Sequence, residues 1–119
     1  MNQVDRLAEL LKNLERSLQE CGYPHLRLNQ QHIAKKNMSF SGANGRIWIQ
    51  PVNGEYDISL SGKALESELT LVMVGLCGRK CDGFKQLNKR LGRTDQPYWR
   101  VADFSLVEAA VQSYAKTKR

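Results

Sequence analysis

Apolar residues recur at three- and four-residue steps through the first part of the chain, at Val4, Leu7, Leu11, Leu14 and Leu18. This spacing lines one face of a helix. Asn2 supplies a cap for that helix, and the Gly-Tyr-Pro sequence at 22–24 predicts its end. The following stretch fits two forms, because 26–28 alternates as in a short strand whereas 30–36 fits a helical turn.

Three short segments with alternating polarity follow, at 38–42, 46–52 and 55–61. Asn44-Gly45 and Asn53-Gly54 separate them, and Asn-Gly is the strongest short-range signal for a two-residue hairpin turn. The pattern predicts a three-stranded antiparallel meander. Counting outward from the turns pairs Ile49 with Ile58, Ile47 with Leu60, and Phe40 with Ile49. This register places the large aliphatic residues on one face.

The opposite face of the meander is polar apart from one tryptophan. It carries Ser39, Ser41, Arg46, Trp48, Gln50, Asp57 and Ser59. An exposed tryptophan beside an arginine suits stacking on a nucleic-acid base or anchoring of a partner protein. The alternative is structural: a helix covers this face, or Trp48 packs at a sheet edge.

Two helices are predicted next. Apolar residues at helical spacing favour a helix over 64–76, although 71–74 also fits a buried strand. Asp82 is placed to cap a short basic helix that ends at Gly92 and turns Phe84 inward.

The last part of the chain predicts a strand and a helix. The strand covers 98–102, and a capping box that begins at Ser105 opens a helix to about Lys116. The whole order is α–βββ–α–α–β–α, an α+β fold. The length of 119 residues suits one hydrophobic core, so we expect a single domain spanning 1–119.

Positive charge is concentrated in one stretch. The chain has a formal net charge of +6, and the segment 79–100 holds seven basic residues against two acidic ones. Such a local positive field attracts polyanions, nucleic acid first and an acidic protein surface second. The alternative is a solvated surface that only keeps the protein in solution.

The predicted nucleic-acid-binding residues combine this basic stretch with both tryptophans. They are Arg79, Lys80, Lys85, Lys89, Arg90, Arg93, Arg100, Trp48 and Trp99. The basic side chains on the outer face of the predicted helix would follow a phosphate backbone. Tyr98 and Trp99 are neighbours in a strand, so one faces the core and the other faces outward, where its ring suits base stacking.

Few side chains suit catalysis. The two histidines, His25 and His32, lie in no recognisable nucleophile or metalloprotease motif, and the chain has no Walker loop. A non-catalytic protein is therefore favoured and no cofactor is expected, although site residues can also converge from distant positions. The sequence carries no family signature.

Zinc binding is a further hypothesis. Cys21 and His25, with Cys77 and Cys81, form two pairs that together offer four ligands of the kind that bind Zn²⁺. Structural zinc pairs usually have a shorter gap, so ordinary thiols at a helix junction are the alternative. Three cysteines do not suit a disulfide framework and fit a reducing compartment.

No segment predicts export or membrane insertion. The longest apolar run, 69–76, is well short of the roughly 20 residues that cross a bilayer. Charged residues near the N-terminus interrupt any signal sequence. We therefore expect a cytoplasmic protein.

Two functions from different classes stay open. The first is a nucleic-acid-binding accessory protein that uses the 79–100 surface for DNA or RNA, with binding that weakens steeply with salt. The second is a protein-interaction module, for an acidic partner or for a second copy of the chain through the leucine-lined first helix. Its binding should tolerate salt.

Overall fold

Three helices and six strands make up the part of the chain that the computed structural model describes, namely residues 3–29, 38–42, 45–61, 69–85 and 96–117. In chain order the elements are α1 (Gln3–Glu20), β1 (Arg27–Asn29), β2 (Met38–Gly42), β3 (Gly45–Val52), β4 (Glu55–Ser61), α3 (Leu69–Cys77), β5 (Gly83–Lys85), β6 (Gln96–Val101) and α4 (Phe104–Thr117). The radius of gyration is 13.3 Å, close to the roughly 13.5 Å of a compact domain of this length. The predicted α+β class is confirmed.

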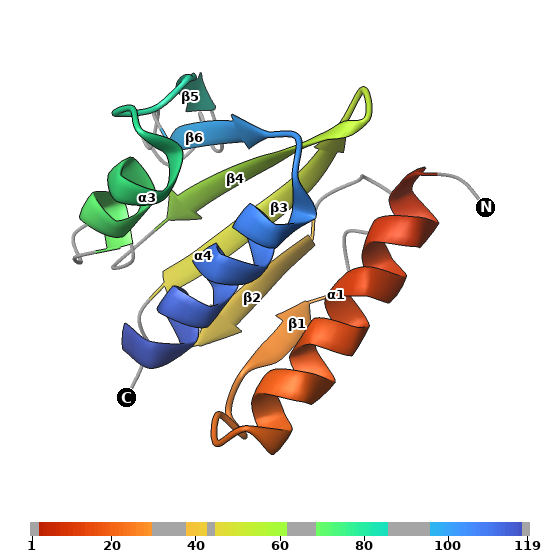
Figure 1. Cartoon of the computed structure of the whole chain (residues 1–119). Coiled ribbons are helices and arrows are strands. Elements are labelled where there is room, and N and C mark those ends of the chain that lie inside the picture. The colour runs from red at the N-terminus through yellow and green to blue at the C-terminus, as the bar shows by residue number, and fades with distance from the viewer. Residues whose placement is uncertain (1–2, 30–37, 43–44, 62–68, 86–95, 118–119) are drawn as a thin grey trace, which may run out of the picture.

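One antiparallel sheet contains all the described strands, in the order β1-β2-β3-β4-β6-β5. The helices α1, α3 and α4 lie on one face of this sheet (Figure 1). Their buried side chains join those of the strands in a single core, whose largest members are Trp99, Tyr114 and Phe40. None of the helices in the described residues has the length and hydrophobicity needed to span a bilayer.

The apolar stripe of α1 faces this core. Leu7, Leu11, Leu14 and Leu18 are at most 7% exposed, and burial of each leucine side chain contributes about 1.5–3 kcal/mol. The helix ends as the sequence predicts. Gly22 adopts a φ of 112°, and the Tyr23 amide donates to the Leu18 carbonyl at 3.0 Å, which is the bond of a Schellman cap.

The meander formed by β2, β3 and β4 is confirmed. Ile49 pairs with Ile58 and Ile47 pairs with Leu60. Asn53 and Gly54 have φ values of 49° and 84°, and two consecutive positive φ values are what a type I′ hairpin turn requires.

The first hairpin has a different register from the predicted one. Phe40 pairs with Ile47 rather than Ile49, and Gly42 pairs with Gly45, so the turn begins one residue earlier than predicted. The observed register sets Met38, which is fully buried, opposite Ile49. The error moves Phe40 by two positions along β3, and a two-residue shift keeps every side chain on its face. The predicted aliphatic face is therefore correct.

The prediction that a helix begins at Asp82 is wrong. Gly83–Lys85 is a strand that pairs with β6, and the rest of the predicted helix lies outside the described residues. Asp82 caps no helix here, because its carboxylate accepts hydrogen bonds from the Arg79 side chain and the Arg100 backbone amide. Phe84, predicted to face inward, is 62% exposed.

The remaining predictions agree with the structure where it describes them. β1 is the short strand expected near 26–28, while 30–36 lies outside the described residues. α3 confirms a helix rather than a strand over 71–74, and the predicted start of that helix, 64–68, also lies outside them. β6 is the strand expected at 98–102, and it starts two residues earlier.

The last helix starts at a different cap from the predicted one. α4 begins at Phe104, because the Asp103 carboxylate accepts a hydrogen bond from the Ser105 backbone amide at 2.9 Å. Asp103 is therefore the N-cap instead of Ser105. The same backbone hydrogen bond lowers the pKa of Asp103.

Candidate nucleic-acid interface

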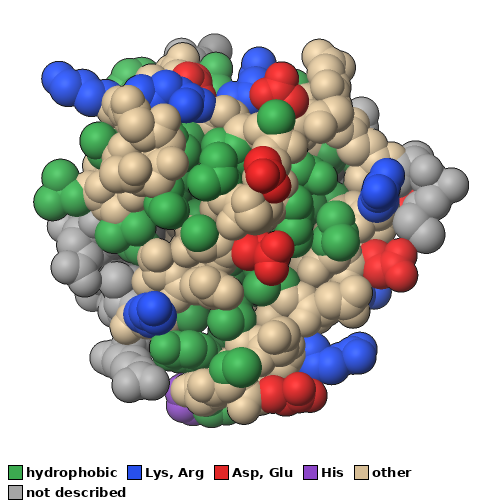
Figure 2. All heavy atoms as spheres, viewed as in Figure 1, with side chains coloured by type: hydrophobic (Ala, Val, Ile, Leu, Met, Phe, Trp, Pro, Cys, Tyr) green, Lys and Arg blue, Asp and Glu red, His purple; other side chains and the backbone are tan. Residues whose placement is uncertain are grey.

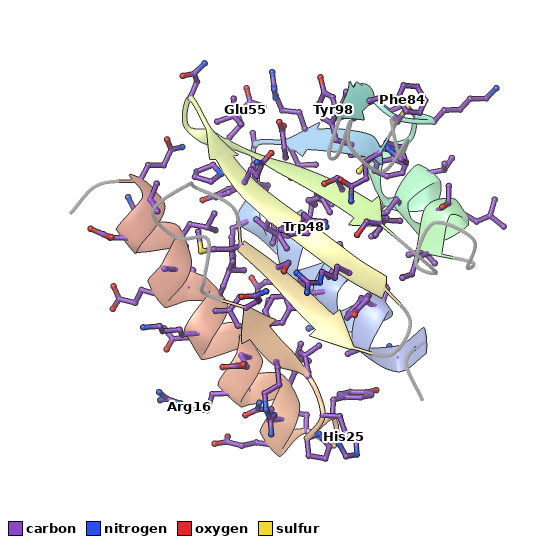
Figure 3. All side chains as sticks on the ribbon, turned by 180° about the vertical axis from the view of Figure 1, so that it is seen from behind. Arg16, His25, Trp48, Glu55, Phe84 and Tyr98 are labelled. Carbon is purple, nitrogen blue, oxygen red and sulfur yellow. The ribbon has the colours of Figure 1, made fainter. Side chains whose placement is uncertain are left out.

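The face of the sheet opposite the helices carries aromatic and polar side chains. One row crosses five strands through the paired residues Ser39, Trp48, Ser59, Tyr98 and Gly83. Since neighbouring strands lie about 4.8 Å apart, the backbones of Trp48 and Tyr98 are roughly 10 Å apart, with Ser59 between them. Figure 3 views the molecule from this side and labels both aromatic residues.

Trp48 lies near the centre of this face (Figure 3). Its indole N–H donates to Ser61 Oγ at 2.9 Å, which fixes the plane of the ring. The guanidinium carbon of Arg46 lies 5.5 Å from the ring centroid, within the range of a cation–π contact. The side chain is half-buried, so its ring is both oriented and partly accessible.

Tyr98 is the second aromatic residue of this face. The guanidinium carbon of Arg100 lies 5.6 Å from its ring centroid. The ring also lies against Gly83, where an added Cβ would come within 2.9 Å of Tyr98 Cε1. Each outward aromatic ring thus has an arginine beside it, two residues away on its own strand.

Arg100 is held by a carboxylate from the neighbouring strand. Its Nε and Nη2 donate to Asp57 Oδ1 and Oδ2 at 2.8 and 3.0 Å. The Asp57 side chain is 1% exposed, whereas that of Arg100 is 42% exposed. The hydrogen bonds to Asp57 raise the pKa of Arg100 further above its ordinary value. The pair presents an oriented guanidinium at the surface.

Arg79 has a structural role in this fold. Its Nε and Nη2 donate to the two carboxylate oxygens of Asp82 at 2.6 and 2.7 Å, and Nη2 also donates to the Arg100 carbonyl at 2.6 Å. The Arg79 hydrogen bond holds the pKa of Asp82 below its usual value. These contacts hold the turn between α3 and β5 against β6, so the Arg79 guanidinium is bonded within the chain although its side chain is 41% exposed.

Trp99 does not belong to the candidate interface. It is fully buried among core residues on the helix side of the sheet, and its indole N–H donates to the Arg79 carbonyl at 3.0 Å. A ring with no exposed surface cannot stack on a base, so the structure removes Trp99 from the predicted set. Its neighbour Tyr98 faces outward instead.

The other predicted basic residues are less fully described. Lys80 is exposed beside Arg79, and the backbone of Lys85 belongs to β5. The side chain of Lys85 and the whole of Lys89, Arg90 and Arg93 lie outside what the structure describes. The basic surface at 79–100 stays a prediction, and of its members the structure places Arg100 on the same face as Trp48.

Sequence reasoning left Tyr98 and Arg46 out of the binding set. The two-residue period of a strand places each arginine on the same face as the aromatic residue two positions away, but it does not say which face is outward. Arg46 and Trp48 in β3, and Tyr98 and Arg100 in β6, each form such a pair.

The predicted zinc ligands do not come together. Cys21 and His25 follow the end of α1, whereas Cys77 is the last residue of α3 and Cys81 lies in the turn between α3 and β5. All four belong to the described residues, among which no group of three or more histidine, cysteine, aspartate or glutamate side chains could hold a metal ion. The zinc hypothesis is wrong for this fold. Burial raises the pKa of the Cys77 thiol, which makes it a less reactive group.

The sheet face that carries Trp48 and Tyr98 also carries buried polar side chains. Within the described part of the chain they are Ser39, Asp57, Ser59 and Gln96. All four project away from the helices, as the strand pairing requires. On the helix side, basic and acidic side chains are interspersed (Figure 2), and that side shows no continuous basic patch among the described residues.

Comparison with known proteins adds no assignment, because no family model, curated protein or solved structure matches the chain.

Proposed function

We propose that this protein binds single-stranded nucleic acid on the sheet face that carries Trp48 and Tyr98. One observation carries the proposal: two outward aromatic rings, each with an arginine beside it, share a face that no described helix covers. Unstacked bases bind to such rings, and aromatic residues on an antiparallel sheet are a common platform for single strands.

The two arginines support binding of the strand as well as of its bases. A guanidinium group contacts phosphates and also stacks on base planes. The Asp57 contact orients Arg100 before any ligand arrives, which reduces the side-chain entropy lost on binding. The ion pair uses Nε and Nη2 and leaves Nη1 outside it.

The proposal favours single strands over duplexes. Bases in a duplex stack on one another and present only their edges to a protein. The rings of Trp48 and Tyr98 reach a base plane only if the pair is opened, which costs a few kcal/mol. A duplex of the same sequence should therefore bind more weakly than the single strand.

Fluorescence anisotropy of a labelled single strand tests the proposal. Tyr98→Ala should weaken binding about 5- to 150-fold, because stacking on one aromatic residue contributes about 1–3 kcal/mol. Phe84→Ala is the matched control: Phe84 is 62% exposed but projects from the other face, since it pairs with Pro97 and not with Tyr98. An equal loss in both variants, or in neither, contradicts the proposal.

Tryptophan emission gives a second readout. The chain has two tryptophans, and Trp99 is fully buried, so a bound strand should quench mainly Trp48. Trp48→Phe keeps an aromatic surface and should retain most of the affinity while the quenching disappears. Quenching that persists in Trp48→Phe would place the ligand elsewhere.

A protein-interaction role has separate support at α3. Leu71 and Phe84 are 75% and 62% exposed, and hydrophobic side chains gather at the surface over α3, on the left of Figure 2. The leucines of α1 are buried in the core of this chain, so they are not the docking surface. If α3 binds a second copy, sedimentation should show concentration-dependent association that Leu71→Glu abolishes.

A further inference from the structure

The two pairs of ring and arginine lie on strands that run in the same direction. β3 and β6 are each antiparallel to β4, which lies between them, so they are parallel to each other. Along the chain the arginine comes two residues before the ring in β3, but two residues after the ring in β6. The two arginines therefore lie on opposite sides of the row that joins Trp48 to Tyr98.

The strand register gives the arrangement an approximate two-fold axis. Arg46 pairs with Ser61, two residues to one side of Ser59 in β4. Arg100 pairs with Asp57, two residues to the other side. The backbones of the two arginines are thus two strands and four residues apart, roughly 16 Å by the dimensions of a sheet. Half a turn about an axis through Ser59, perpendicular to the sheet, exchanges the two arginines and also the two rings.

Each half of this arrangement, which we call a half-site, consists of a ring and its own arginine. The guanidinium carbons of Arg46 and Arg100 lie 5.5 and 5.6 Å from the ring centroids of Trp48 and Tyr98. Both rings and Arg46 are half-buried, and Arg100 is exposed, so all four side chains keep accessible surface. A ring suits a base plane and a guanidinium suits a phosphate. Each half-site therefore fits one nucleotide.

We propose that one strand occupies both half-sites and that the face accepts it in either 5′-to-3′ direction. A nucleic-acid strand has a direction, whereas an arrangement with a two-fold axis has none. Half a turn of a bound strand of one repeated base again places a base on each ring and a phosphate beside each arginine. Between the rings β4 carries only the small, buried side chain of Ser59, so no bulky side chain of that strand separates the half-sites.

The spacing of the half-sites sets the length of strand that fills them. The ring residues are roughly 10 Å apart at the backbone, about three times the 3.4 Å rise of one stacked nucleotide, so the two bound bases do not stack on each other. A mononucleotide reaches one half-site only. A dinucleotide has a single phosphate between its sugars, and a trinucleotide is the shortest unmodified strand with a phosphate for each arginine.

The inference rests on the proposed function, and titration of a mononucleotide, a dinucleotide and a trinucleotide of one base tests it. Chemical shifts of the isotope-labelled protein report the affinities. The trinucleotide should bind about five-fold or more tightly than the mononucleotide, because a second base stacks on a second ring. In Tyr98→Ala this gain with length should disappear. In Phe84→Ala, on the other face, the gain should persist.

A nitroxide at either end of the trinucleotide tests the direction of the strand. Ser39 in β2 and Gly83 in β5 continue the row of rings beyond its two ends, so their amide resonances report which end of the strand is near. When both directions are occupied, a 5′ nitroxide broadens both amides and a 3′ nitroxide does the same. If the 5′ label broadens one amide and the 3′ label the other, the direction is fixed and the inference is overturned.

The remaining outcomes separate the inference from the proposed function. The length series and the nitroxide experiment both use the wild type, so neither depends on the folding of a variant. Equal affinity for mononucleotide and trinucleotide, or a gain with length that survives in Tyr98→Ala, shows that one strand does not bridge the half-sites. Absence of binding to a long single strand overturns the proposed function itself.

Discussion

The position of the Tyr98 ring depends on a residue without a side chain. Because a Cβ at Gly83 would come within 2.9 Å of Tyr98 Cε1, Gly83→Ala should push the ring aside. The outer part of a side chain has to move, so we expect a stability loss of about 1 kcal/mol, the lower end of the range for overpacking. The affinity for single strands should fall with it. Thermal unfolding and anisotropy measure the two effects.

Gly75 in α3 provides the control for the Gly83→Ala substitution. A Cβ there meets nothing within 4 Å, so Gly75→Ala should leave binding unchanged and stabilise the helix by about 0.5–1 kcal/mol. Wild-type affinity in Gly83→Ala would show that the placement of the Tyr98 ring is irrelevant to binding.

Ionisation of Tyr114 should lower the stability of the fold at alkaline pH. Its hydroxyl donates to the Gly45 carbonyl at 2.8 Å, and burial raises its pKa from 10.0 to about 12. Folding therefore favours the neutral phenol. Its contribution is fully present below pH 10 and is lost as the pH rises toward 12, by about 2–3 kcal/mol.

Tyr114→Phe isolates this contribution. Below pH 10 the variant should be less stable by about 1 kcal/mol, the net contribution of one hydrogen bond. Between pH 10 and 12 the wild type should lose stability faster than the variant, as measured by denaturant unfolding across that range. Parallel pH profiles would contradict a buried, neutral Tyr114.

At the scale of elements, the turn between α3 and β5 depends on Asp82. Its carboxylate accepts from Arg79 and from the Arg100 amide, and these bonds lower its pKa below 3.8. A lowered folded-state pKa stabilises the fold above the unfolded value, and this contribution is lost as the pH falls through the folded value. Asp82→Ala should cost about 1 kcal/mol at neutral pH, since the pair is largely exposed.

Acid conditions provide the check on Asp82. Well below pH 3.8 the wild-type carboxyl is protonated, so wild type and Asp82→Ala should approach the same unfolding midpoint. A difference that is constant with pH would mean that the variant acts through packing and not through the charged network.

The sequence predicts those elements correctly that are determined by residues within the element itself. The Asn53-Gly54 turn dictates its own hairpin, and the α1 leucines repeat with the period of their helix. β5 is different, because Asp82 and Gly83 are held by contacts with Tyr98 and Arg100 of β6. The local pattern after Asp82 therefore predicts a helix, but pairing with β6 makes the segment Gly83–Lys85 a strand.

At the scale of the whole molecule, the candidate face is assembled by strand order. β6 inserts between β4 and β5, and this brings Tyr98 and Arg100 beside the strand that carries Asp57. Sequence could assign Trp48 to the polar face of its hairpin, because that needs only the local register. It could not choose between Tyr98 and Trp99, nor pair Arg100 with Asp57, because both depend on a contact across about 40 residues of chain.

The salt dependence of binding separates this assembled face from the basic segment that charge alone suggests. Each phosphate neutralised on a single strand contributes about −0.7 to the slope of log K against log salt, so contacts from Arg46 and Arg100 alone predict about −1.4. Engagement of all seven basic residues of 79–100 would predict about −5. We expect the shallow slope, because the proposed contacts come from Arg46 and Arg100 beside the two aromatic rings, and we expect it unchanged when Lys85, Lys89 and Arg90 are all replaced by glutamine. A steep slope that this triple variant flattens would move the phosphate contacts from the sheet face to the basic segment.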